Sequence, residues 1–126
     1  MDERYPTGAN RASRAIYGGS RGALAAADLV LREPGSVSHC ICFSPATRPT
    51  DFLSTVEAAG PNAPSFFILI ARYDLRFRRD GVSLADLLVG RGYDVTAIEI
   101  PDGHSLLAWR QHLGRGLESF PTLAPR

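Results

Sequence analysis

Gly18-Gly19-Ser20-Arg21-Gly22 is the stretch that decides the fold, because it joins a strand-like run to a helical run. Residues 13–17 before it predict a β-strand, and the alanine- and leucine-rich residues 23–31 after it predict a helix. A G-x-S-x-G pattern in this setting is typical of a nucleophile elbow, a sharp turn that lifts a serine hydroxyl out of a sheet. Gly18 and Gly22 are expected to leave room for neighbouring backbone that a Cβ would fill.

The rest of the chain alternates strand-like and helix-like segments. Besides the strand at 13–17, strands are predicted at residues 36–43, 65–71 and 93–100. Besides the helix at 23–31, helices are predicted at residues 50–59, from Asp80 or Ser83 to 90, and from Ser105 to about 120. The run at 65–71 is apolar from its second residue onward and is expected to be a strand buried on both faces. About four parallel strands alternating with helices imply a three-layer α/β fold.

Length and composition are those of an ordinary soluble domain. The 126 residues suit a single domain, or part of one, with residues 1–12 as a loose lead-in and residues 121–126 as a tail. A net charge of +1 gives no reason to expect a nucleic-acid or membrane partner. The chain has no apolar run near the roughly 18 residues of a spanning helix and no signal-peptide pattern, so a cytoplasmic location is expected.

Cys40 and Cys42 lie two residues apart on a predicted strand. We expect their side chains to point to opposite faces, which disfavours a disulfide, and we interpret both as buried free thiols in a reducing compartment. The spacing of the three histidines and two cysteines matches no known metal site, so neither a metal nor a cofactor is expected.

Three chemically useful residues follow predicted strands, at the edge where a parallel sheet gathers its functional groups. Ser20 follows the first strand, Asp74 the third and His104 the fourth, and serine, acid, histidine is the order that the hydrolase elbow fold uses. A serine becomes nucleophilic when a histidine takes its proton and a carboxylate orients that histidine. Asp80 and Asp102 are rival acids, but Asp80 is expected to begin a helix and Asp102 lies two residues from His104 in a tight turn.

Residues 71–77, 84–95 and 101–110 resemble the esterase family that includes enterochelin esterase and esterase D. Members of that family end with a Gly-Gly-His segment followed by Trp-Arg, which is similar to His104 and Trp109-Arg110 here, although Asp102 stands where the first glycine is usual. The resemblance covers about residues 12–120. It implies the C-terminal half of an α/β-hydrolase fold and a cofactor-free esterase that acts on a small ester.

Carried over by position, the resemblance implies that Ser20 is the nucleophile, Asp74 the acid and His104 the base. The N–H of Arg21 would be one oxyanion donor, while the second comes from a loop before the elbow that this sequence lacks. The strand at 13–17 would also expose an edge that invites a second copy or a partner chain. A truncated reading frame, a fragment completed by association and a degenerate remnant all stay open. The alternative function is therefore a catalytically silent half-domain for interaction or assembly, or one without independent activity.

Structural interpretations of the same residues also stay open. Ser20 would then cap the helix, Asp74 would pair with Arg72 or Arg76, and His104 would belong to a structural turn.

Other conspicuous residues are given structural interpretations too. The three arginines within residues 76–79 form either a solvated surface or a patch that steers an acidic substrate. Trp109 is expected to anchor its helix to the sheet, and His39 and His112 are interpreted as structural.

Overall fold

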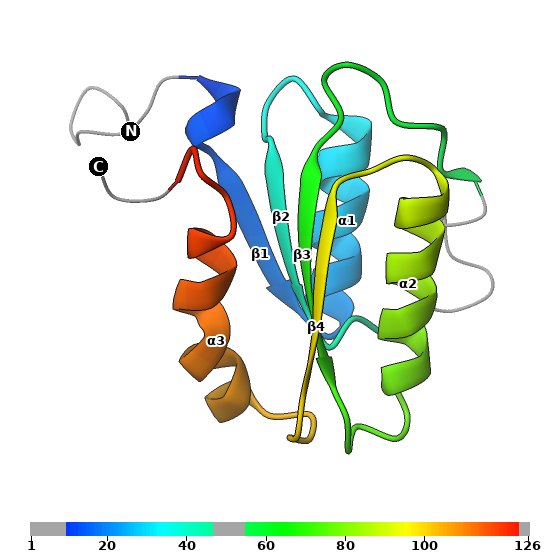
Figure 1. Ribbon diagram of the computed structural model, residues 1–126, viewed down its shortest axis with the longest axis vertical. Helices are drawn as coiled ribbons and strands as arrows, with labels where there is room; N and C mark the ends of the chain where they lie inside the picture. Colours follow the sequence, from blue (N-terminus) through cyan, green and yellow to red (C-terminus); the bar gives the residue numbers. More distant parts are fainter. Residues whose placement is uncertain (1–9, 47–54, 124–126) are drawn as a thin grey trace.

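The computed structural model describes residues 10–46 and 55–123. Its four strands are β1 (Ala15–Gly19), β2 (His39–Phe43), β3 (Ser65–Ala71) and β4 (Val95–Ile100). They form one sheet in the order β1-β2-β3-β4, and every neighbouring pair is parallel (Figure 1). The predicted α/β class and parallel sheet are therefore confirmed.

Helices cover both faces of this sheet. In the described residues they are α1 (Arg21–Arg32), α2 (Arg78–Gly90) and α3 (Leu106–Glu118), preceded by a short 3-10 helix, η1 (Arg11–Ser13). Helices α1 and α2 share one apolar cluster with one face of the sheet, and α3 shares a second cluster with the other face (Figure 1). The three predicted layers are thus α1 with α2, the sheet, and α3. None of the described helices is long and apolar enough to cross a bilayer.

Strand β3 lies inside the sheet and is buried on both of its faces. Phe66, Ile68 and Ile70 belong to the cluster under α1 and α2, while Phe67 and Leu69 belong to the cluster under α3. Alternate residues of a strand point to opposite faces, so an apolar residue is needed at every position. The bounds of this strand agree with the prediction from sequence.

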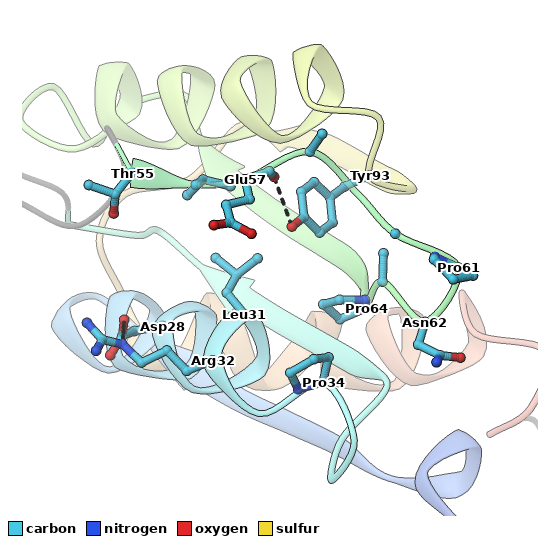
Figure 2. A pocket seen from close by; sticks show the side chains of 14 residues that line it. Asp28, Leu31, Arg32, Pro34, Thr55, Glu57, Pro61, Asn62, Pro64 and Tyr93 are labelled. Atoms are coloured by element: carbon cyan, nitrogen blue, oxygen red, sulfur yellow. Dashed lines mark hydrogen bonds and ion pairs between the residues drawn. The ribbon is translucent and has the colours of Figure 1, made fainter.

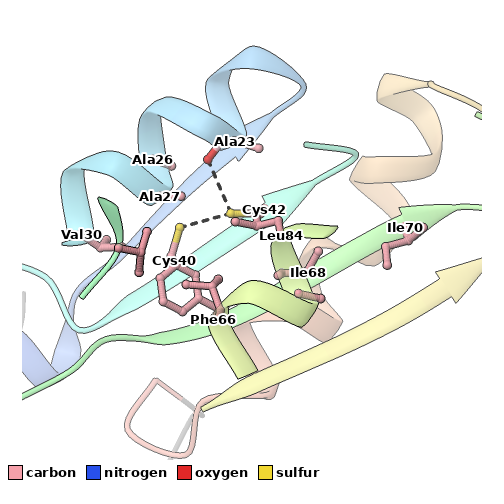
Figure 3. Packing of buried hydrophobic residues seen from close by; sticks show 13 residues of the cluster. Ala23, Ala26, Ala27, Val30, Cys40, Cys42, Phe66, Ile68, Ile70 and Leu84 are labelled. Atoms are coloured by element: carbon pink, nitrogen blue, oxygen red, sulfur yellow. Dashed lines mark hydrogen bonds between the residues drawn. The ribbon is translucent and has the colours of Figure 1, made fainter. Parts of the chain in front are cut away.

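The two cysteines correct one expectation. Cys40 and Cys42 do not point to opposite faces: both lie in the cluster under α1, with their Sγ atoms 3.4 Å apart (Figure 3). The reason is the period of the strand, because residues two apart share a face. Both are free thiols and fully buried, as expected. The hydrogen bond to Cys42 and burial together raise the pKa of Cys40 well above its ordinary value.

The predicted helix at 50–59 is not found where the chain is described. Residues 50–54 lie outside the described residues, and residues 56–60 are not helical. This stretch bonds to the loop before β4 instead: Ala59 N–H donates to Arg91 O over 2.9 Å, and the Tyr93 hydroxyl donates to Glu57 O over 3.2 Å. Tertiary hydrogen bonds therefore take the place of the helical ones.

The first strand begins later than predicted and continues into the glycines. Ser13, expected as the first residue of the strand, belongs to η1 instead, where the Asn10 side chain accepts a hydrogen bond from Ser13 N–H over 3.1 Å. Gly18 and Gly19 are strand residues that lie opposite Cys42 and Phe43 of β2. The turn to the helix is consequently made by Ser20 alone.

Candidate active site

Ser20 is the single residue between β1 and α1, and the backbone holds it from three directions. Its N–H donates to Phe43 O over 2.9 Å, and its carbonyl accepts from Ala23 N–H and Ala46 N–H, each over 3.1 Å. Its φ of 56° lies in the left-handed region that a side chain rarely adopts, a strain characteristic of functional turns. The Ser20 side chain makes no capping hydrogen bond, which argues against the interpretation as a helix cap.

Of the two glycines expected to leave room around Ser20, Gly18 does so and Gly22 does not. A Cβ on Gly18 would lie 2.0 Å from Gly22 O, so this position needs glycine. A Cβ on Gly22 would meet nothing within 4 Å, which corrects the expectation that Gly22 itself leaves room. A Cβ on Gly19 would lie 2.6 Å from the Trp109 ring. The close approach at the turn is therefore made at Gly18 and Gly19, the last two residues of β1.

Asp74 and His104 meet beyond the ends of β3 and β4. Asp74 Oδ2 and His104 Nδ1 are 2.5 Å apart, and Asp74 Oδ1 also accepts from Phe77 N–H over 3.3 Å. Asp74 is 6% exposed, whereas the His104 side chain is 31% exposed. A carboxylate on Nδ1 fixes the tautomer that leaves the lone pair on Nε2, the arrangement that a general base requires.

Backbone hydrogen bonds tie the loop that carries Asp74 to the loop that carries His104. Arg72 N–H donates to Ile100 O over 2.8 Å, and Tyr73 N–H donates to Asp102 O over 2.9 Å. The acid and the histidine therefore have a shared scaffold, which explains how residues 30 positions apart keep one geometry.

The rival acids take other places. Asp102 lies in the loop before His104 and supplies a backbone carbonyl, while Asp80 lies in the first turn of α2. The structure also differs from the interpretation in which Asp74 pairs with Arg72 or Arg76. The Asp74 carboxylate is hydrogen-bonded to His104 and accepts a hydrogen bond from Phe77 N–H instead.

The arginines near Asp74 are engaged at the surface. Arg72 and Arg78 each contact the Glu99 carboxylate over 2.8 Å, and the Arg76 guanidinium lies 5.1 Å from the centre of the Phe77 ring. The hydrogen bond from Arg72 and, to a smaller extent, the one from Arg78 lower the pKa of Glu99. Of the three arginines of the expected steering patch, Arg78 is thus paired with Glu99 and Arg76 lies against the Phe77 ring, which weakens the case for steering of acidic substrates.

Trp109 connects the histidine to the elbow. Its ring lies edge-on to the His104 ring with centroids 5.0 Å apart, and it also contacts Gly19, the neighbour of Ser20. Its Nε1–H donates to Ser44 Oγ over 3.0 Å. Among the described residues no hydrogen bond joins Ser20 to His104; the indole lies against the His104 ring on one side and against Gly19, the residue before Ser20, on another. The expectation that Trp109 anchors α3 to the sheet is met by these contacts.

The N-terminus of α1 faces the same edge of the sheet as these side chains. Arg21 is the first residue of α1, and the first N–H groups of a helix have no intrahelical acceptor. The helix dipole adds a partial positive charge at this end. A developing oxyanion next to Ser20 would therefore find a donor at Arg21 N–H.

A hollow in the described part of the chain lies away from these side chains. It measures about 530 Å³ and is lined by the end of α1, residues 55–64 and Tyr93, at the amino ends of the strands (Figure 2). None of Ser20, Asp74 and His104 lines it. Nor do three or more His, Cys, Asp or Glu side chains gather as metal ligands anywhere in the described ranges. The hollow therefore adds nothing to the chemistry proposed for the other edge.

Sequence reasoning missed Ser44 and Gly19. Ser44 directly follows β2, is 2% exposed and has a φ of 46°. The rule that selected the residues just past each strand applies to Ser44 as well, and would have found it. Gly19 had no comparable signal, since only the fold brings Trp109 against it.

His39 is structural, as expected. Its Nε2 lies 3.0 Å from Ala12 O and 2.7 Å from Thr122 Oγ1, and its ring stacks on Phe120. Burial lowers its pKa. His39 therefore joins η1, β2 and the residues after α3.

Several solved structures share this fold. Enterochelin esterase from Shigella flexneri superposes with a TM-score of 0.80 at 18% identity, covering 94% of this chain and 33% of its own. S-formylglutathione hydrolase from Staphylococcus aureus gives 0.75 at 15% identity, covering 98% and 56%. A ferulic acid esterase gives 0.75 at 16% identity. Neither a protein-family model nor a curated relative matches the chain.

These comparisons confirm at the level of the fold the resemblance seen in the sequence. The chain has the fold of part of an esterase-like α/β-hydrolase, and it spans about a third to a half of the chains it matches. Identities of 15 to 18% show a shared fold and leave the chemistry to the site itself.

Proposed function

We propose that this chain is a serine hydrolase module that acts on carboxylic esters. The observation that carries the proposal is the contact between Asp74 Oδ2 and His104 Nδ1, with a buried acid and a partly exposed imidazole. A structural turn would not need a carboxylate on that nitrogen. Ser20 lies at the same edge of the sheet with a positive φ and a side chain that makes no capping hydrogen bond, which supports the proposal independently.

In the proposed mechanism Ser20 Oγ attacks the ester carbonyl while His104 Nε2 takes the hydroxyl proton. His104 is then an imidazolium, which the Asp74 carboxylate stabilises. The tetrahedral oxyanion accepts a hydrogen bond from Arg21 N–H. When the intermediate collapses, His104 returns the proton to the leaving alcohol, and an acyl-enzyme remains. Water then attacks this ester by the same route, releasing the acid and restoring Ser20.

The similar structures favour an ester as the substrate, since enterochelin esterase and ferulic acid esterase are named for ester cleavage. The His104 side chain is partly exposed, so a small-molecule ester can reach it directly from solvent. We also propose a cytoplasmic location, where a reducing environment would keep Cys40 and Cys42 as thiols despite their 3.4 Å separation.

The edge of the sheet favours a second candidate, a catalytically silent module for assembly. In the part of the chain that the structure describes, β1 pairs only with β2 and leaves its other edge open. Tyr17 on this strand is 44% exposed. An open edge with an apolar side chain is suited to pairing with a strand from a second copy or another chain. Size-exclusion mass distinguishes a monomer from such an assembly.

Hydrolysis of a p-nitrophenyl ester tests the primary proposal. Ser20→Ala should lower the rate at least about 10³-fold, because the nucleophile is lost. Ser83→Ala, at an exposed position of α2, is the matched control and should keep the wild-type rate. Equal rates in the two variants would refute the role of Ser20. A folded, inactive wild-type protein that forms a dimer would favour the assembly module instead.

A further inference from the structure

The four-stranded sheet poses a distance problem for the proposed chemistry. Ser20 follows β1 and His104 follows β4, and these strands form opposite edges of the sheet. Neighbouring strands lie about 4.8 Å apart, so the axes of β1 and β4 are separated by about 14 Å. A serine and a histidine that exchange a proton must lie within hydrogen-bond reach. Some group must therefore bring His104 back across the sheet and hold it there.

Trp109 has the position and the contacts to do this. It belongs to the first turns of α3, which packs over β2 and so crosses the sheet toward β1 (Figure 1). One side of the indole meets the His104 ring at 85°, and Cζ3 and Cε3 lie 2.6 and 2.8 Å from where a Cβ of Gly19 would be. Trp109 is 6% exposed, so the indole is buried where it lies against His104 and Gly19.

Ser44 fixes the indole in this place. A buried indole N–H needs an acceptor, and Ser44 Oγ provides one at 3.0 Å. Ser44 is itself held by its N–H, which donates to Leu69 O over 2.9 Å at the end of β3. The indole is thus attached through Ser44 to the central strands, which are the most buried part of the sheet.

We propose that Trp109 and Ser44 are positioning residues that set the distance between the His104 imidazole and Ser20. Neither touches substrate in this scheme; the indole acts as a spacer between the two edges of the sheet, and Ser44 keeps it from rotating. The proposal rests on the proposed hydrolase function, but the contact of Trp109 with His104 is measurable without any activity.

The spectroscopic test uses the fact that Trp109 is the single tryptophan of the chain. A protonated imidazole against an indole quenches the emission of the indole, so wild-type fluorescence should fall in a step as the pH is lowered. His104→Gln should abolish this step. Ser44→Ala should reduce its amplitude, because the indole is no longer fixed against the imidazole. A step that persists in His104→Gln, or is unchanged in Ser44→Ala, would overturn the proposal.

The kinetic test measures how fast a fluorophosphonate labels Ser20. Trp109→Phe and Ser44→Ala should each lower the maximal labelling rate about 10-fold with little change in reagent affinity, since misplacement by 1 Å costs up to about 10²-fold. Phe66→Leu, in the cluster on the opposite face of the sheet, is the matched core control and should label at the wild-type rate. Equal loss in Phe66→Leu would mean that general stability explains the effect. An unlabelled wild-type protein would refute the hydrolase function, and the fluorescence step would still decide the contact.

Discussion

Gly18→Ala is the substitution whose effect follows most directly from the geometry of the turn. The added Cβ would lie 2.0 Å from Gly22 O, 2.3 Å from Gly22 C and 2.6 Å from Ala23 N. All three are backbone atoms, so no side-chain rotation relieves the overlap and α1 must move away from β1. Overpacking that side chains can absorb costs about 1–3 kcal/mol, and here we expect about 3 kcal/mol or more. For a domain of this size, that lowers Tm by about 10 °C.

Gly22→Ala is the matched control on the other side of Ser20. Nothing lies within 4 Å of its added Cβ, and alanine is favoured over glycine in a helix by up to about 1 kcal/mol. Urea denaturation followed by circular dichroism should therefore show a large loss of stability for Gly18→Ala and a small gain for Gly22→Ala. If Gly18→Ala stayed within about 0.5 kcal/mol of wild type, the description of the turn would be wrong.

Three further predictions concern groups away from the turn. In wild type, the pairs of Glu99 with Arg72 and Arg78 stabilise the folded state at neutral pH, and this stabilisation is lost as the pH falls below 4.5 toward the lowered pKa of Glu99. Glu99→Gln removes the pairs, so thermal melts should show this pH-dependent loss of stability in wild type alone. Burial lowers the pKa of His39 from 6.5, so the unfolded state binds a proton more readily than the folded state. The urea concentration at the unfolding midpoint should therefore decrease as the pH is lowered from about 7.5 to about 5.5, and it should decrease less in His39→Gln. Cys40 and Cys42 are both 0% exposed and the pKa of Cys40 is raised, so iodoacetamide should alkylate neither until the protein is unfolded, as followed by intact mass; rapid alkylation of folded protein would contradict their burial.

Local patterns were sufficient for much of the fold. The run Ser65–Ala71 was identified as the central strand from its sequence, because an unbroken apolar stretch from Phe66 to Ala71 has the length and composition typical of a strand buried on both faces. The rule that parallel strands end at one functional edge selected Asp74 and His104, which the structure brings to 2.5 Å. That rule requires only the order of strands, which the sequence indicates.

What the sequence could not supply depends on distant contacts. The hydrogen bond from Trp109 to Ser44 joins residues 65 positions apart, and the contact of Trp109 with Gly19 exists only because α3 crosses the sheet. The absence of helix at residues 56–60 has the same origin, since Arg91 and Tyr93 satisfy the backbone there. The error over Cys40 and Cys42 was different: the period of a strand already places them on one face.

Covalent labelling of Ser20 by a fluorophosphonate, located by peptide mass spectrometry, tests the central claim most directly, because this reagent reacts with activated serines. We predict that the wild-type chain is labelled at Ser20, and that Asp74→Asn is labelled about 10⁴-fold more slowly, since an amide cannot hold the required tautomer of His104. A folded wild-type protein that stays unlabelled, or an Asp74→Asn variant labelled at the wild-type rate, would contradict the account.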